Sequence, residues 1–129
     1  MDNTDIAKEW FKIAEADLSS AEFLQNMHPV PIEIICYHCQ QSTEKYLKGF
    51  LALKGEKIKR THDLVPLIKE CQKYDEDFET IEEDGLMLTD YGVNVRYPFR
   101  MDINESDMKI AVKNAHKIKD FVLAKANIK

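Results

Sequence analysis

The chain has 129 residues, of which 44% are hydrophobic and 32% are charged, and its formal net charge is -5. The length fits one compact domain, and this hydrophobic content excludes a disordered chain. The acidic balance argues against non-specific binding to duplex nucleic acid, which requires a basic surface. Only four glycines and four prolines are present, which favours long helices over many short strands.

Three cysteines are spread over two predicted helices: Cys36, Cys39 and Cys71. They cannot all pair, and the sequence shows neither a secretory leader nor an apolar run of the roughly 18 residues that a membrane span needs. We therefore expect reduced thiols, a cytoplasmic protein and no membrane association. A zinc site with His38 is the alternative, but on a helix His38 points away from the two neighbouring cysteines. Core packing of the cysteines is favoured, and we predict neither a metal nor a cofactor.

Five segments carry hydrophobic residues at the spacings of three and four that are typical of an amphipathic helix. The predicted helices span about residues 5–26, 31–54, 62–74, 78–95 and 104–126. The second is apolar around most of its girth and is expected to lie at the centre. In the first, Asp17 interrupts the apolar stripe, and we expect it to pair with a Lys or Arg of a neighbouring helix. Asn104 is predicted to cap the last helix, with Asp107 at the capping-box position.

These elements predict an all-α fold, an antiparallel up-down bundle of four to five helices. No repeat, low-complexity tract or linker divides the sequence. The chain is therefore expected to form a single helical domain over residues 1–129.

The second predicted helix also carries a polar face. Its members follow one another at spacings of three and four: His38, Gln41, Lys45 and Lys48. Residues from two other segments join this face if the bundle brings them to the same end: His62, Arg96, Tyr97 and Arg100, with Tyr91 as a further aromatic residue. Such cations suit a phosphate, and a tyrosine ring can stack on a base. In the alternative interpretation the lysines are solvated and Gln41 forms an interhelical hydrogen bond.

Four short sequence motifs are, in combination, typical of one protein family. They are W-F-K-I-A-E-A-D-L-S-S-A at 10–21, C-Y-H-C-Q-Q-S-T-E-K-Y-L-K-G at 36–49, T-H-D-L at 61–64 and Y-G-V-N-V-R-Y-P at 91–98. In this combination the chain resembles the HEPN family (higher eukaryotes and prokaryotes nucleotide-binding domain) over nearly its full length. The resemblance implies a helical bundle that is usually homodimeric. It also implies a minimal nucleotidyltransferase as partner, in two-component modules of which many are toxin–antitoxin pairs.

Many members of the family are metal-independent ribonucleases whose signature is an arginine, four to six intervening residues and a histidine. No histidine stands at that spacing after Arg60, Arg96 or Arg100. Without this imidazole, ribonuclease chemistry loses its usual acid–base group. The leading hypothesis is therefore a non-catalytic or weakly catalytic module that binds nucleotide or RNA phosphate as the partner of a nucleotidyltransferase. The alternatives are a ribonuclease toxin with a non-standard site containing His62 and Arg96, and a structural dimerisation module.

Overall fold

The computed structural model describes residues 1–92 and 102–128, and every regular element in them is a helix. The α-helices are α1 (Asn3–Leu24), α2 (Ile32–Leu53), α3 (Leu64–Gln72), α4 (Glu82–Thr89) and α5 (Glu105–Ala126). Two short 3-10 helices, η1 (Glu76–Ile81) and η2 (Asp90–Gly92), flank α4. The all-α class predicted from the sequence is confirmed. No helix in the described part of the chain combines the length and apolar character that crossing a bilayer requires.

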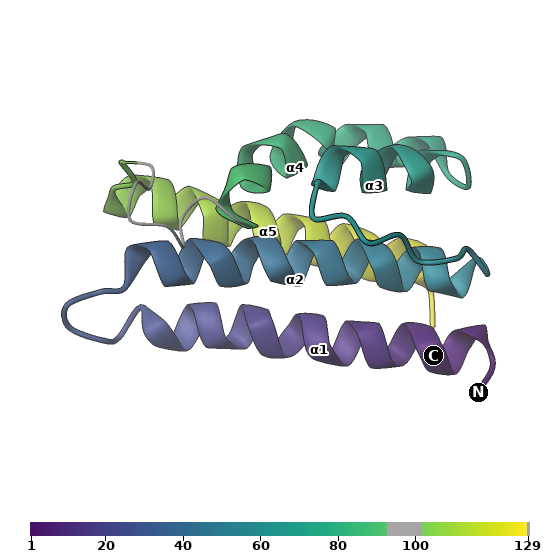
Figure 1. Ribbon diagram of the computed structural model, residues 1–129, viewed down its shortest axis with the longest axis horizontal. Coiled ribbons are helices and arrows are strands. Elements are labelled where there is room, and N and C mark those ends of the chain that lie inside the picture. Colours follow the sequence, from purple (N-terminus) through teal and green to yellow (C-terminus); the bar gives the residue numbers. More distant parts are fainter. Residues whose placement is uncertain (93–101, 129) are drawn as a thin grey trace.

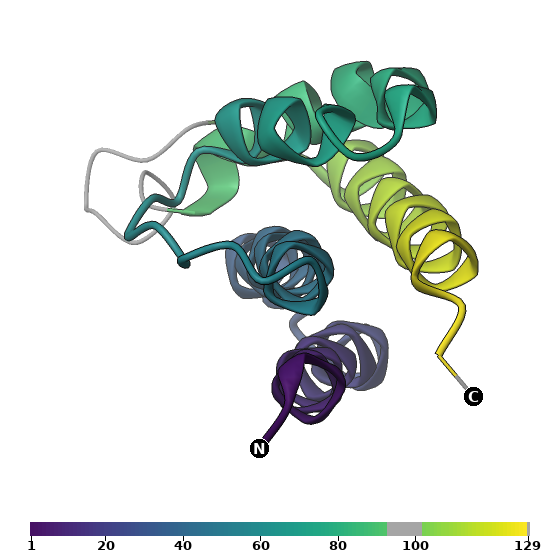
Figure 2. The same cartoon turned by 90° about the vertical axis from the view of Figure 1, so that its right-hand side faces the viewer.

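The three long helices form the body of the molecule, with α3 and α4 packed on the side of α2 that faces away from α1 (Figures 1 and 2). α1 and α2 are antiparallel, whereas α5 runs in the direction of α2. The chain can make this arrangement because the extended segment after α2 leads it back along that helix before α3 begins. This segment is central to the candidate site below.

Local sequence signals account for where α1 and α5 begin. The Asp2 side chain accepts a hydrogen bond from the backbone N–H of Asp5, and the Asp5 side chain accepts one from the backbone N–H of Asp2. The same reciprocal box joins Asn104 and Asp107 at the start of α5, as predicted. Each box satisfies backbone donors that the first helical turn leaves without partners.

Two predicted helices differ from the structure. The helix expected over 62–74 begins two residues later, because His62 is held in an extended loop by contacts with α2. The helix expected over 78–95 is divided into η1, α4 and η2, and residues beyond Gly92 lie outside the described part. A Cβ at Gly85 would lie 2.4 Å from Cδ1 of Ile68, so the glycine lets α4 approach α3 closely.

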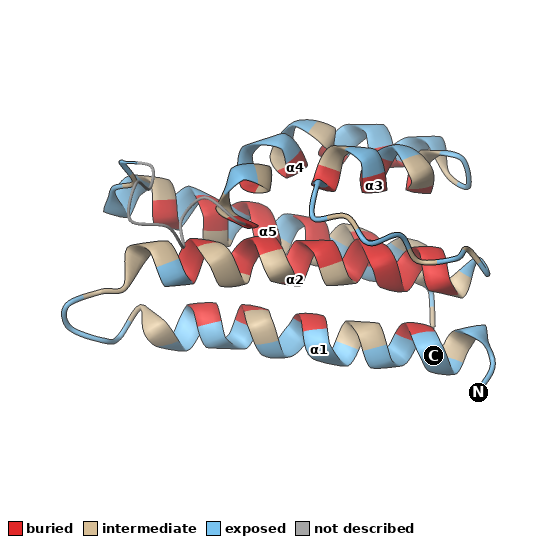
Figure 3. Ribbon diagram, in the orientation of Figure 1, coloured by how far each residue is buried: buried red, intermediate tan, exposed pale blue. Residues whose placement is uncertain are grey.

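The predicted central position of α2 is confirmed, since most of its residues are buried (Figure 3). The centroid of the Phe50 ring lies 4.6 Å from that of the Phe78 ring. The Phe78 centroid in turn lies 5.0 Å from the centroid of the Phe121 ring on α5. The three cysteines are unpaired and fully buried in this core, also as predicted. Burial raises the pKa of Cys36 to about 12. The thiols therefore act as small apolar groups.

α1 and α2 approach one another closely at Gly49. A Cβ at this position would lie 2.5 Å from Cε1 of Phe11 and 3.0 Å from Cβ of Trp10. The absence of a side chain thus lets the Phe11 ring and the Cβ of Trp10 pack directly on the α2 backbone. The contact helps to place the face of α1 that carries Trp10 against α2.

We predict that Gly49→Leu lowers the free energy of unfolding by about 1–3 kcal/mol, because the new side chain overpacks the α1–α2 contact. Urea unfolding followed by circular dichroism measures the change. Ala124→Leu, at an exposed position of α5, is the matched control and should leave the midpoint nearly unchanged. Equal midpoints for Gly49→Leu and the wild type would contradict the close approach.

Candidate functional site

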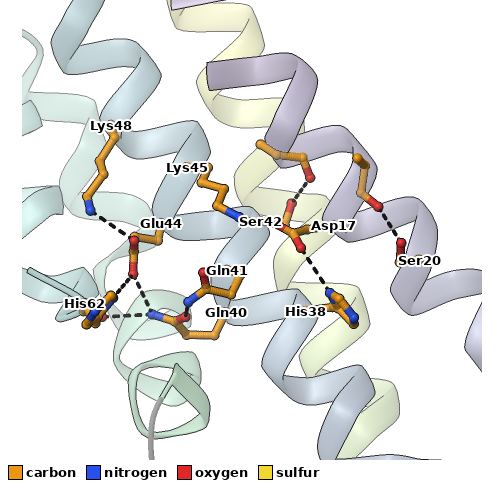
Figure 4. A network of polar contacts seen from close by, with 12 residues as sticks. Asp17, Ser20, His38, Gln40, Gln41, Ser42, Glu44, Lys45, Lys48 and His62 are labelled. Atoms are coloured by element: carbon orange, nitrogen blue, oxygen red, sulfur yellow. Dashed lines mark hydrogen bonds and ion pairs between the residues drawn. The ribbon is translucent and has the colours of Figure 1, made fainter. Parts of the chain in front are cut away.

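The polar face predicted along α2 divides into two clusters (Figure 4). In the first, Asp17 of α1 accepts a hydrogen bond from the Lys45 ammonium, with 2.6 Å between Nζ and Oδ2. Its other oxygen lies 3.0 Å from Nδ1 of His38. The prediction that Asp17 pairs with a cation of a neighbouring helix is confirmed. Much of the charge on this side of α2 is therefore already matched by a carboxylate.

The second cluster is centred on Glu44, whose side chain is only 5% exposed. Its carboxylate accepts from the Lys48 ammonium at 3.0 Å and from the Gln40 amide at 3.4 Å. Nδ1 of His62 lies 2.9 Å from the same carboxylate. Removing a carboxylate from water is costly unless several donors replace its hydration, and here three donors do so.

This carboxylate fixes the orientation of the His62 ring. An ionised carboxylate can only accept, so Nδ1–H must donate to Glu44, and Nε2 is left on the opposite side of the imidazole. The His62 side chain is 63% exposed, so its outer edge is accessible. The Gln40 amide also donates to the main-chain oxygen of His62 at 2.8 Å. Both the backbone and the ring of this residue are thus anchored to α2.

Gln40 also links His62 to another part of the chain. A Cβ at Gly92 would lie 2.7 Å from Cδ of Gln40, so the η2 backbone rests directly on this side chain. Gly92 is the last described residue before the segment 93–101. Gln40 therefore contacts both the loop that carries His62 and Gly92 at the end of η2.

The remaining predicted site residues are placed as follows. Gln41 donates from its amide to Oε1 of Gln40 at 2.8 Å, which is a contact within α2 and not between helices. Lys48 is buried, and its ammonium lies 5.9 Å from the centroid of the Trp10 ring. Tyr91 packs against the hydrophobic core, and burial raises the pKa of its hydroxyl to about 12. Three predicted residues lie outside the described part of the chain: Arg96, Tyr97 and Arg100.

Sequence reasoning did not assign a role to Gln40 or Glu44. The available signal was a glutamate four residues before a lysine, a spacing that favours an ion pair. This pair stands within a helix that is otherwise apolar around most of its girth. The burial of the pair depends on the loop that covers it, which helical spacing does not reveal. Across the described ranges, 1–92 and 102–128, no group of three or more His, Cys, Asp or Glu side chains is arranged to hold a metal ion.

We predict that Glu44→Ala destabilises the protein by about 3–5 kcal/mol, because it leaves the buried Lys48 ammonium without its carboxylate. The matched control is Glu105→Ala, which breaks another Glu–Lys pair at the same i,i+4 spacing. Both partners of that pair are more than 60% exposed, so its loss should cost less than about 1 kcal/mol. Urea unfolding of the two variants makes the comparison. Equal losses would show that burial of Glu44 adds nothing.

Comparison with known proteins identifies the family. The HEPN domain sequence model matches residues 7–126. The crystal structure of TT1696 from Thermus thermophilus superposes with a TM-score of 0.80 at 23% identity, over 92% of this chain and 97% of that one. ST0689, described as an archaeal HEPN homologue, superposes with a TM-score of 0.74 at 25% identity, over 94% and 98% of the two chains. No curated protein sequence matches. Because the family match covers nearly the whole sequence, this chain belongs to the HEPN domain family.

Proposed function

We propose that this HEPN domain binds the phosphate groups of a nucleotide or of RNA at the outer edge of His62. The observation that carries the proposal is the Glu44–His62 contact, which points Nε2 away from α2 on a ring that is 63% exposed. A protonated imidazole held in this way can donate to a phosphate oxygen through Nε2. Binding is aided because the ring is already ordered before the ligand arrives.

The loop that carries His62 is basic in an otherwise acidic chain. Between the end of α2 and His62 it contains four cations and one carboxylate: Lys54, Lys57, Lys59, Arg60 and Glu56. Lys59 is paired with Glu70, whereas Lys57 and Arg60 are exposed and have no ion pair among the described residues. Arg60 stands two residues before His62. A local concentration of positive charge attracts phosphate even when the net charge of the protein is negative.

We also assign Arg96, Tyr97 and Arg100 to the proposed site. They follow Gly92, which contacts the same Gln40 side chain that holds His62. Two guanidinium groups would supply bidentate contacts to phosphate, and the tyrosine ring would stack on a base. His38, Gln41, Lys45 and Lys48 have a different part in this proposal, since their contacts within the protein stabilise the face beside the site.

The proposal includes two protein partners that the family resemblance suggests. The domain would form a homodimer and would act with a minimal nucleotidyltransferase in a two-component, toxin–antitoxin-like module. In such a module the HEPN domain would hold the nucleotide or RNA on which the transferase acts. The missing arginine-to-histidine signature is what favours a binding role over ribonuclease catalysis.

Calorimetric titration tests the binding site. We expect ATP, GTP or a short RNA to bind the full chain, either alone or together with a nucleotidyltransferase encoded by a neighbouring gene. In His62→Ala the Kd should rise tenfold or more, because a charge-assisted hydrogen bond is lost. His116→Ala is the matched control, since this 40% exposed histidine pairs with Glu22 elsewhere on the surface. The absence of heat in every combination would contradict the proposal, as would equal effects of the two variants.

A second candidate function is metal-independent RNA cleavage by His62 and Arg96. The observation that favours it is again the carboxylate–imidazole pair, because a fixed ring with an outward Nε2 can take up or release a proton at a 2′-hydroxyl or a leaving oxygen. Incubation of total RNA with the purified protein and EDTA separates the two functions. Cleavage that disappears in both His62→Ala and Arg96→Ala would establish the ribonuclease. Intact RNA under conditions in which the protein binds it would leave the binding function alone.

A further inference from the structure

One side of α1 carries exposed apolar side chains that no other described helix covers. Glu15 and Glu22 on the opposite side pair with Lys119 and His116, so that side faces α5. Away from α5, a shallow hollow is lined by five residues: Met1, Ile6, Glu9, Trp10 and Ile13. Ile6 and Ile13 are 38% and 48% exposed. This first apolar patch thus occupies the N-terminal half of α1.

A second apolar patch lies at the other end of the same helix. It surrounds a hollow lined by five residues: Ser19, Ser20, Phe23, Leu24 and His38. Phe23 is 76% exposed. Ile34 stands one turn before His38 on α2 and is 47% exposed. Both hollows are lined mainly by residues of α1 at the surface of the molecule, so both remain available to another surface.

The cluster of Asp17, His38 and Lys45 separates the two patches. Asp17 follows Ile13 by one turn on α1, and His38 lines the second hollow as well as contacting Asp17. Figure 4 shows these side chains together where α1 and α2 meet. The surface formed by the two patches and this cluster is here called the α1–α2 face. It carries large apolar side chains at both ends, with Glu9 at the first and two serines at the second, and an ion pair in the middle.

We propose that the α1–α2 face binds the same face of a second copy about a twofold axis near Asp17, with the two α1 helices antiparallel. A twofold axis pairs positions that stand at equal distances on either side of it. With the axis between Ala16 and Asp17, Trp10 lies opposite Phe23 of the second copy, and Ile13 lies opposite Ser20. The apolar–polar–apolar order reads the same in both directions, as a twofold interface requires.

The size of the face agrees with this occupant. A helix of 22 residues is roughly 33 Å long, and two adjacent helices are roughly 20 Å wide. Their product is on the order of 700 Å² for each protomer, close to the roughly 800 Å² of a standard stable interface. A smaller docking segment would leave one apolar end uncovered.

The charge distribution also favours a second copy. The acidic excess is concentrated in η1 and α4, which, with the residue before them, contain seven carboxylates: Asp75, Glu76, Asp77, Glu79, Glu82, Glu83 and Asp84. These elements lie across α2 from α1 (Figure 1). In the middle of the α1–α2 face, Asp17 is matched by Lys45 at 2.6 Å. Two copies can therefore meet there with little repulsion, although each has a formal net charge of -5.

This inference identifies the surface that the homodimer in the proposed function would use, and rests on that part of it. Sedimentation velocity of the full chain should show a dimer, and Ile13→Asp should raise its dissociation constant tenfold or more, because the carboxylate would be buried without a partner. The double variant Ile13→Asp, Ser20→Lys should recover dimerisation, since the antiparallel pairing brings the new charges together. Leu86→Asp, which alters a 62% exposed side chain on α4, is the matched control and should stay dimeric.

Fluorescence of Trp10, the single tryptophan of the chain, gives an independent readout. Its emission should shift to longer wavelength when the wild type is diluted into monomers, and Ile13→Asp should start at the shifted position with an unchanged circular dichroism spectrum. A dimeric Ile13→Asp would overturn this interface and leave the homodimer standing. A monomeric wild type would overturn both, even if it bound ATP or RNA. A double variant that stays monomeric would rule out the antiparallel pairing. Binding of an added nucleotidyltransferase, and not of a second copy, to the α1–α2 face would rule it out as well.

Discussion

The buried carboxylate of Glu44 is the group on which the path of the chain after α2 depends. At 5% exposure it needs donors from the protein, and it obtains them from Lys48 on its own helix and from His62 on the following loop. Gln40 adds a third contact and also holds the backbone of His62. The loop must return along α2 to supply these groups. That return explains why α3 begins at Leu64 and why a histidine stands at the surface with a fixed orientation.

The two polar clusters of α2 have different consequences for the molecule. The contact of Asp17 with His38 and Lys45 joins α1 to α2. It also matches the Asp17 carboxylate with the Lys45 ammonium in the middle of the α1–α2 face. The Glu44 cluster joins α2 to the loop and to η2, and it leaves one edge of an imidazole exposed. In our proposals the first cluster lies in a protein–protein interface and the second supports a phosphate site. The division follows from which neighbour each side chain can reach.

Periodicity was sufficient to predict the helical class, the central place of α2, the buried cysteines and a cation partner for Asp17, because each depends on which side of a helix a residue occupies. It was insufficient for the polar face. His38, Gln41, Lys45 and Lys48 share one stripe, but His38 and Lys45 reach across to α1 whereas Lys48 turns to Glu44. The contact between Glu44 and His62 joins residues 18 apart in the sequence. It depends on the course of a loop that no repeating pattern describes.

Glu44 holds His62 with Nδ1 directed inward and Nε2 directed outward. Long-range proton–nitrogen NMR correlation of the imidazole rings tests it directly, at about pH 8 where a typical histidine is neutral. We expect the nitrogen shifts of His62 to report a proton on Nδ1 and a bare Nε2, and we expect Glu44→Gln to alter this pattern. Shifts typical of a ring protonated on Nε2, or averaged over both forms as in an unfolded chain, would contradict this orientation of His62.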